Sequence, residues 1–350
     1  MEISSTTADN LDLVTAALLS KQSLLVSALR PILPEHALLW EPEDTIPYEC
    51  DGLAAYRRMP LAVALPETEE QVAQILKICF EMQVPIVPRG SGTGLSGGAM
   101  PISQGLVLSL AKLKKIISID PFTRTAVVQP CVRNLAISEA VAHLGLYYAP
   151  DPSSQIACSI GGNVNENSGG VHCLKYGLTL HNVLKVRGIL MNGEIVEFGS
   201  LAPDSPGLDL LAIVMGSEGM LAVVTEVTVR LIAKPKLARV IMASFDDIEK
   251  GADAVAAIIA AGIIPAGLEM MDKATTRAVE EFVHAGYDLE AETILLCESD
   301  GTPEEVAEEI ERMTKVLEQA GASGIQISQN EAERLKFWSG RKNAFPAAGR

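Results

Sequence analysis

The run PRGSGTGLSGGA, residues 88–99, places five glycines within nine positions. Glycine adopts positive φ at little cost, so successive amide N–H groups in such a run can turn inward and form a concave site for an anion. Phosphate fits that chemistry without a lysine. Side chains in the same run offer further polar contacts: Arg89, Ser91, Thr93 and Ser96. The structural alternative is a tight connection between two strands, although such a turn needs fewer glycines.

Two well-known nucleotide loops do not fit this run. Residues 92–97 match G-x-G-x-x-G, and Asp120 follows at a suitable distance. In a dinucleotide fold the last glycines open a helix, but here Gly98, Pro101 and Gly105 follow, and a helix interior tolerates neither glycine nor proline well. A Walker loop is excluded because it needs Lys and then Ser or Thr where Gly98 and Ala99 stand.

Two later clusters share the same composition. Residues 150–177, PDPSSQIACSIGGNVNENSGGVHCLKYG, are rich in small residues and low in regular pattern. A loop of this length inside a compact domain is usually functional, and a mobile surface loop is the alternative. Residues 216–219, GSEG, precede a predicted strand and are compatible with an ordinary turn.

Histidine and cysteine spacing predicts no complete metal site. The histidines lie far apart without ligand spacing, and the cysteines form no C-x-x-C pair. We therefore expect reduced, mostly structural thiols and no iron–sulfur cluster in this chain. The residues concerned are His36, His143, His172, His181, His284, Cys50, Cys79, Cys131, Cys158, Cys173 and Cys297.

Composition narrows the class of protein. With 350 residues, 48% of them hydrophobic, the chain is long enough for two domains, and its apolar runs are too short to span a membrane. The net charge of −16 opposes nucleic acid and anionic membrane surfaces. The N-terminus lacks a secretory signal, so we expect a cytoplasmic protein with no nucleic-acid partner and no direct membrane insertion.

Strands and helices that would position the clusters follow from periodicity and turn chemistry. Thr68 and Gln71 have the spacing of a capping box, and Asn192-Gly193 predicts a hairpin. Before Pro235 we expect strands at 61–65, 84–88, 105–110, 116–120, 125–132, 185–191, 194–198 and 220–232, and helices at 66–83, 134–145 and 207–215.

Beyond Pro235 strands and helices alternate, which predicts an α/β layer with helices covering a sheet. The expected strands are 238–245, 264–271, 293–299 and 324–328, and the expected helices are 246–262, 272–283, 303–320 and 330–343.

Taken in order, the three clusters resemble the FAD-binding domain of the vanillyl-alcohol oxidase/p-cresol methylhydroxylase family. The run RGSGTGLSGG…PDPSS…CSIGGNVNENSGG…KYG…GSEGMLAVVTE carries the resemblance. It is greatest to the FAD-linked 2-hydroxy-acid dehydrogenases, the group of glycolate oxidase and D-lactate dehydrogenase. The resemblance implies an α+β fold: a helical lead-in at 1–56, a two-subdomain α/β FAD-binding domain of the p-cresol methylhydroxylase type at 57–234, and an α/β cap or substrate domain at 235–350.

The same resemblance implies which residues contact FAD. The first loop would wrap the pyrophosphate through Pro88, Arg89, Gly90, Ser91, Gly92, Thr93, Gly94, Leu95 and Ser96. Residues on the isoalloxazine and ribityl side would be Pro152, Ser153, Gly161, Gly162, Asn163, Ser168 and Gly169, with Ser154, Tyr176 and Gly177 completing the set. Glu218, Gly219 and Val223 would approach the adenosine or ribityl portion. Thr93 replaces the histidine of covalently flavinylated members, so FAD is expected to be non-covalent.

For the reaction, the resemblance implies oxidation of glycolate or D-lactate to the 2-keto acid, with hydride passing to flavin N5. Trp338 and Arg341 match a substrate-binding position where guanidinium can hold a carboxylate at two points; the alternative is a solvated helix arginine. Electrons would continue to partner subunits or quinone. The implied partners are a second flavin-domain subunit and an iron–sulfur subunit, which would give a peripheral location at the inner membrane.

One departure from the family concerns catalysis. Members carry H-x-G-D-G-N-x-H and G-E-H-G segments, and neither occurs here, so we expect a C-terminally truncated cap domain, with the catalytic base and metal ligands beyond residue 350. Removal of the hydroxyl proton needs such a group, so this chain alone is expected to be inactive and no catalytic residue is assigned. The alternatives are a flavin-binding or assembly module and another reductase, such as the cell-wall enolpyruvyl reductase.

Overall fold

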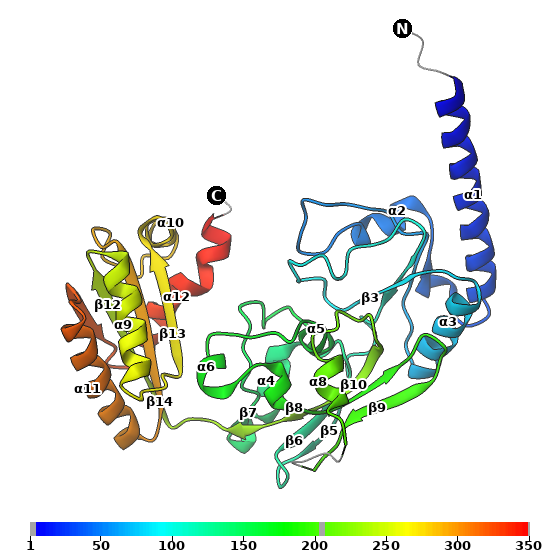
Figure 1. The fold of residues 1–350 in the computed structure, drawn as a ribbon. Helices are drawn as coiled ribbons and strands as arrows, with labels where there is room; N and C mark the ends of the chain where they lie inside the picture. The colour runs from blue at the N-terminus through cyan, green and yellow to red at the C-terminus, as the bar shows by residue number, and fades with distance from the viewer. Residues whose placement is uncertain (1–4, 203–206, 349–350) are drawn as a thin grey trace. The chain divides into compact units, whose positions relative to one another are not determined.

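The structure, a computed structural model, describes residues 5–202 and 207–348 (Figure 1). Contacts divide these residues into two compact units. Unit 1 comprises the described residues up to Tyr148, then Ser154–Ser168 and Thr179–Ile232. Unit 2 comprises Ala149–Ser153, Gly169–Leu178 and the described residues from Ala233 onward. Two short stretches before residue 179 belong to unit 2, so neither unit is one continuous segment of the chain. The domain boundaries expected at residues 57 and 235 stay a prediction.

The first sheet of unit 1 has the order β1-β2-β4-β3. Strands β2, β4 and β3 are parallel, and β2 and β4 are buried along their length, which explains their unbroken apolar sequence. The strands are β1 (Leu38–Leu39), β2 (Ala62–Ala64), β3 (Ile86–Arg89) and β4 (Leu106–Ser109), and the helices are α1 (Ser5–Leu29), η1 (Glu35–Ala37), α2 (Pro42–Thr45), η2 (Ile46–Tyr48) and α3 (Glu69–Glu81).

Helix α3 begins at Glu69, three residues after the predicted start and directly after the predicted cap residue Thr68. The reciprocal cap is displaced by one residue. The Gln71 N–H donates to Thr68 Oγ1 at 3.3 Å, while Gln71 Oε1 accepts from the N–H of Glu67 at 2.7 Å. Two backbone donors at the helix start are still satisfied, so the cap keeps its physical role.

The second sheet of unit 1 is antiparallel with the order β5-β6-β10-β8-β9. Its strands are β5 (Ile116–Asp120), β6 (Thr125–Val128), β8 (Val183–Ile189), β9 (Ile195–Gly199) and β10 (Val223–Arg230); β7 (Leu146–Tyr147) and β11 (Ile232–Ala233) pair separately. Asn192-Gly193 joins β8 to β9 with Gly193 at φ 85°, which confirms the predicted hairpin. Unit 1 also contains the helices α4 (Asn134–Val141), η3 (Ala142–Leu144), α7 (Thr179–Asn182) and α8 (Leu210–Val214).

Helix α5 (Ile160–Glu166) lies within residues 150–177, which the sequence predicts to be low in regular structure. Ile160 and Val164, four residues apart, are fully buried and pack in one core with strands of the second sheet. Gly161-Gly162 lowers the helix propensity and hides this short amphipathic pattern in the sequence. A second short helix, α6 (Cys173–Tyr176), lies in the part of the stretch that belongs to unit 2.

The main sheet of unit 2 is antiparallel with the order β13-β14-β12-β15. Its elements are β12 (Leu237–Phe245), β13 (Gly267–Asp272), β14 (Thr293–Gly301), β15 (Gly324–Ile327), α9 (Ile248–Ala260), α10 (Lys273–Val283), α11 (Pro303–Gln319) and α12 (Glu331–Ala348). Alternating residues of β12 face two separate cores, one with α9 and α11 and the other with α10 and α12. The predicted α/β layer is confirmed (Figure 1).

Within residues 5–202 and 207–348, no helix combines the length and the apolar character needed to cross a membrane.

Candidate functional site

A cavity in unit 1 brings the three glycine-rich clusters together. The loop after β3, the first turns of α5 and the turn before β10 supply most of its wall. The lining residues are Asp51, Pro88, Arg89, Gly90, Ser91, Gly92, Thr93, Gly94, Gly98, Ala99, Leu110, Pro130, Ser154, Cys158, Ser159, Gly161, Gly162, Asn163, Asn165, Glu166, Ser168, Glu218 and Val224. Segments that are distant in sequence therefore form one concave surface rich in backbone amides.

The predicted cofactor residues divide into three groups. Those that line the cavity are Pro88, Arg89, Gly90, Ser91, Gly92, Thr93, Gly94, Ser154, Gly161, Gly162, Asn163, Ser168 and Glu218. Leu95, Ser96, Gly219 and Val223 belong to unit 1 but are not among the lining residues. Pro152, Ser153, Gly169, Tyr176 and Gly177 belong to unit 2.

Two neighbouring residues of strand β10 have different surroundings. Val224 lines the cavity, whereas Val223 packs in the core with the first sheet, because side chains alternate along a strand. The contact of Val223 with FAD stays a prediction.

Close packing explains several of the glycines. A Cβ on Gly90 would lie 2.3 Å from Ser159 Oγ, and a Cβ on Gly161 would lie 2.6 Å from Pro130 Cβ. The Ser91 N–H donates to Ser159 Oγ at 3.3 Å, so the loop rests directly on the start of α5. Ser159, the residue before α5, was missed by the sequence analysis, although a serine before an apolar helix is a cap signal.

Arg89 braces the glycine loop. Its Nη1 donates to the Cys50 carbonyl oxygen at 2.7 Å, and its guanidinium lies 5.7 Å from the centre of the Tyr48 ring. A Cβ on Gly92, where φ is +68°, would lie 2.4 Å from Arg89 Nη2. The guanidinium thus packs against the loop backbone while it adds positive charge to the cavity wall.

Three carboxylates also line the cavity: Asp51, Glu166 and Glu218. Burial, followed by the negative charges of Glu218 and Asp51, raises the pKa of Glu166 although Ser96 donates a hydrogen bond to it. Asp51 Oδ1 accepts the N–H of Leu53 at 2.9 Å. Sequence spacing gave no signal for Asp51 or Glu166. Carboxylates accept hydrogen bonds from hydroxyl and amine groups, so the wall offers acceptors as well as the backbone N–H donors of the loop.

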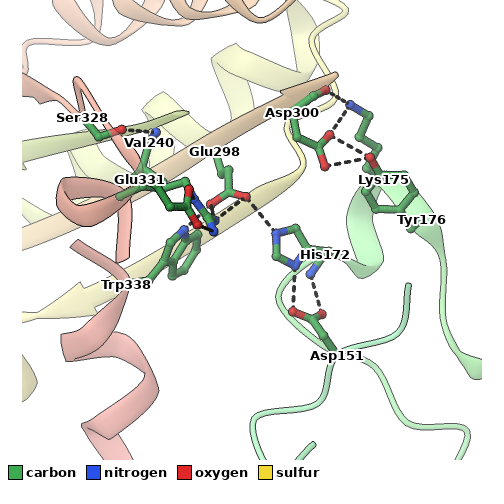
Figure 2. Close-up of polar contacts among 11 residues, drawn as sticks. Asp151, His172, Lys175, Tyr176, Val240, Glu298, Asp300, Ser328, Glu331 and Trp338 are labelled. Carbon is green, nitrogen blue, oxygen red and sulfur yellow. Dashed lines mark hydrogen bonds and ion pairs between the residues drawn. The ribbon is translucent and has the colours of Figure 1, made fainter. Parts of the chain in front are cut away.

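In unit 2, His172 lies between two carboxylates (Figure 2). Its Nδ1 is 2.7 Å from Asp151 Oδ2, its backbone N–H donates to Asp151 Oδ1 at 3.1 Å, and its Nε2 is 3.1 Å from Glu298 Oε1. Burial alone would lower the pKa of His172, but the hydrogen bonds and charges of Asp151 and Glu298 outweigh it and raise the pKa to about 10. The imidazole is therefore cationic near neutral pH, with both N–H groups donating.

Glu298 is the most heavily bonded of these groups. Its carboxylate, 2% exposed, also accepts hydrogen bonds from Arg334 Nη1 at 2.9 Å and from the Trp338 indole N–H. Two residues along β14, Asp300 accepts from Lys175 Nζ at 2.6 Å and from the Tyr176 hydroxyl at 2.8 Å. Sequence reasoning missed this network, because the partners of Glu298 and Asp300 lie 36 to 126 residues away along the chain.

The predicted substrate pair lies on α12. Arg341 Nε donates to Glu269 Oε2 at 2.7 Å, and the side chain is half-buried. Within the described residues its Nη1 and Nη2 groups make no hydrogen bond. Trp338 is 2% exposed and packs in the core between the sheet and α12, which leaves it little surface for a ligand.

No group of three or more metal-binding side chains is arranged around one point in the parts of the chain that the structure describes. All six cysteines are free thiols, and burial raises the pKa of Cys79 and of Cys131 to about 12.

Two family models match the chain, an FAD binding domain over residues 60–199 and an FAD linked oxidase C-terminal domain over residues 234–350. The chain belongs to the family of FAD-linked oxidases. It is 60% identical over 326 residues to the glycolate oxidase subunit GlcD of Escherichia coli K12, covering 93% of this chain and 65% of that protein. It is also 31% identical to a D-lactate dehydrogenase of Anaerostipes hadrus, covering 91% of this chain and 68% of that protein.

The fold likeness agrees with the family. A solved structure of p-cresol methylhydroxylase with substrate bound matches with a TM-score of 0.77 at 20% identity, covering 91% of this chain and 69% of that one. The predicted fold class is therefore confirmed.

FAD is the cofactor of this family, and the cavity fits it. Within the described residues, Asn165 Oδ1 in the wall has no hydrogen-bond partner. A buried acceptor without a donor costs free energy, and a ligand that carries hydroxyl or amine groups would satisfy it. The backbone N–H groups of the glycine loop can donate hydrogen bonds to the anionic part of the same molecule.

Proposed function

We propose that this protein oxidises a small 2-hydroxy acid, glycolate or D-lactate, to the 2-keto acid with FAD as the hydride acceptor. The observation that carries the proposal is the meeting of the three glycine-rich clusters in one cavity, in a chain 60% identical to a glycolate oxidase subunit. The chain spans 65% of the length of that relative, so activity and substrate rest on similarity.

FAD would be held non-covalently. The amides of residues 90–94 would donate to the diphosphate, and Arg89 would add charge beside them. Asp51, Glu166 and Glu218 would accept from hydroxyl and amine groups of the cofactor. Thr93 lines the cavity where a covalently flavinylated protein would need a histidine.

Arg341 would hold the carboxylate of the substrate. Glu269 engages its Nε and so orients the guanidinium, leaving Nη1 and Nη2 for a two-point contact. Such a contact would align the α-carbon, because a fixed carboxylate restricts the rotation of a small substrate. Trp338 is better assigned to packing that positions α12 than to substrate contact.

The proton and the hydride leave the substrate separately. When bound, FAD accepts the hydride from the α-carbon, and the hydroxyl proton must pass to a base. His172 is not suited to that task, because it is already protonated and committed to two carboxylates. The hydroxyl proton therefore needs another acceptor. The alternative of a flavin-binding or assembly module that does not turn over by itself is tested by the experiment below.

Electrons would pass onward to partner subunits or quinone. The E. coli relative is named as a subunit, which supports a subunit partner. The six cysteines have no cluster spacing, which supports an iron–sulfur group on a separate partner beside a second flavin-domain subunit. Such partners would place the protein at the inner membrane surface.

Anaerobic absorbance spectra of the FAD-loaded protein test the proposal. We expect glycolate or D-lactate to bleach the flavin band near 450 nm, with D-2-hydroxyglutarate and NADPH as comparison reductants. A yellow protein that none of these reduces would favour the module, bleaching by NADPH alone would favour a reductase, and a folded protein that takes up no FAD would contradict both main candidates.

A further inference from the structure

The loop Gly169–Leu178, here called the anchored loop, changes compact unit twice. It follows Ser168, which lines the cavity of unit 1, and it precedes Thr179, which again belongs to unit 1. Its own contacts are with unit 2, as are those of the stretch Ala149–Ser153. Ordinary surface loops pack on the domain that they leave, so this one requires a specific attachment.

Two acidic residues of β14 provide the attachment (Figure 2). Glu298 bonds His172, and Asp300 bonds Lys175 and Tyr176, so both ends of α6 are held. Glu298 and Asp300 lie two apart on the strand and therefore point to the same face of the sheet. Both are nearly inaccessible to solvent, with exposures of 2% and 5%.

His172 also joins the anchored loop to the stretch Ala149–Ser153. It contacts both carboxylate oxygens of Asp151, through its ring and through its backbone N–H. The backbones approach closely there, since a Cβ on Gly170 would lie 2.5 Å from the Asp151 carbonyl oxygen. Charges alternate along the network from Asp151 through His172 and Glu298 to Arg334, with the Trp338 ring 6.5 Å from the imidazole.

We propose that His172 is a positioning residue for the flavin, because it fixes the anchored loop and the stretch Ala149–Ser153 to one another and to β14. The inference rests on the proposed function. The stretch Ala149–Ser153 runs directly into Ser154, and the anchored loop directly follows Ser168; both serines line the cavity proposed for FAD. His172 would therefore act on the cofactor through the backbone that it holds.

The chemistry of the bridge favours histidine over other side chains. Two carboxylates on opposite sides need two N–H donors that point apart, and protonated imidazole supplies them. A glutamine of similar length would turn its carbonyl oxygen toward one carboxylate, which repels it. Removing one partner of a buried charge network is costly because the remaining charges lose their compensation.

The experiment compares His172→Gln with His143→Gln, a matched control on the exposed side chain of η3. Circular dichroism establishes folding, and FAD titration with flavin fluorescence gives the dissociation constant of each protein. For His172→Gln we expect FAD to bind about tenfold more weakly, with changed shape of the flavin absorbance band near 450 nm. His143→Gln should match the wild type in both measurements.

A second variant keeps the inference testable if the His172→Gln protein does not fold. Asp151→Asn keeps the bond between His172 and Glu298 but weakens the link between the two segments, and it should move both flavin measurements in the same direction. In the variant that carries both substitutions, the loss of FAD binding free energy should be smaller than the sum of the two single losses. Both substitutions disrupt the same contact, between Asp151 and His172.

The outcomes separate the inference from the proposed function. If the wild type binds FAD and a folded His172→Gln or Asp151→Asn protein binds it with unchanged affinity and spectrum, the positioning role is wrong. If the folded wild type binds no FAD, the proposed function fails, and the positioning role fails with it.

Discussion

His172 Nε2 lies 3.1 Å from Glu298 Oε1, although 126 residues separate them in the chain. The contact joins a glycine-rich loop to the buried face of β14. With Asp151 on the other side of the ring, it creates a cationic group in a largely buried position, and that charge makes the stability of the protein depend on pH.

The first prediction concerns that pH dependence. The pKa of His172 in the folded protein, about 10, exceeds its ordinary value of 6.5, so the folded state holds the proton more tightly than the unfolded chain. The stabilisation is complete below pH 6.5 and is lost as pH rises toward 10. We expect the difference in unfolding free energy between wild type and His172→Gln to shrink across that interval, by at most about 1.4 kcal/mol for each pH unit.

Urea denaturation at several pH values measures this difference. Lysine and tyrosine side chains also titrate near the upper limit, but they do so equally in both proteins and cancel in the comparison. A difference that stays constant from pH 6 to pH 10 would show that His172 is not the titrating group.

The second prediction concerns Gly92→Val. Position 92 has φ +68°, which valine adopts only under strain, and its Cβ would meet the Arg89 guanidinium that braces the loop. We expect the folded variant to lose bound FAD, measured as loss of the absorbance near 450 nm. Gly145→Val is the control, because φ there is +69° and no other atom lies within 4 Å of its Cβ. Equal loss of FAD in both variants would point to general strain rather than to the loop.

These examples show which parts of the site the sequence could predict. Local signals were sufficient for the glycine loop, the Asn192-Gly193 hairpin and the alternation of strands and helices after Pro235. Helix α5 was missed because Gly161-Gly162 obscures a short apolar pattern. The contacts of His172 were missed because their partners lie 21 and 126 residues away, and only tertiary packing brings them together.

The third prediction concerns the packing of α3 on the second sheet of unit 1. Glu69 accepts from Arg187 Nε at 2.9 Å and from Thr225 Oγ1 at 2.6 Å, linking the start of α3 to β8 and β10. Burial would raise the pKa of Glu69, but hydrogen bonds from Arg187 and Thr225 outweigh it and lower the pKa. This contribution to stability is therefore present above the ordinary value of 4.5 and is lost as the medium becomes more acidic.

Glu69→Gln should accordingly reduce the free energy of unfolding by about 1–2 kcal/mol at pH 7. Urea denaturation measures the loss, and Glu70→Gln at the exposed neighbouring position is the control. The loss should diminish below pH 4.5, where the unfolded chain binds a proton at Glu69 that the folded protein, with its lowered pKa, does not yet bind. An equal effect at positions 69 and 70 would contradict the proposed link.

The fourth prediction separates substrate binding from cofactor binding. Arg341→Ala removes the guanidinium whose Nη groups we assign to the substrate carboxylate, so KM should rise by about tenfold to a hundredfold while bound FAD is unchanged. Glu269→Gln removes only the charged partner of Nε and should raise KM less, because the guanidinium remains but is less firmly oriented. Steady-state kinetics with the substrate that bleaches the flavin, beside absorbance of the bound cofactor, measure both effects. Lys342→Ala is the control, since that neighbouring side chain is exposed, and a KM increase of equal size there would favour a general disturbance of α12 over a carboxylate contact.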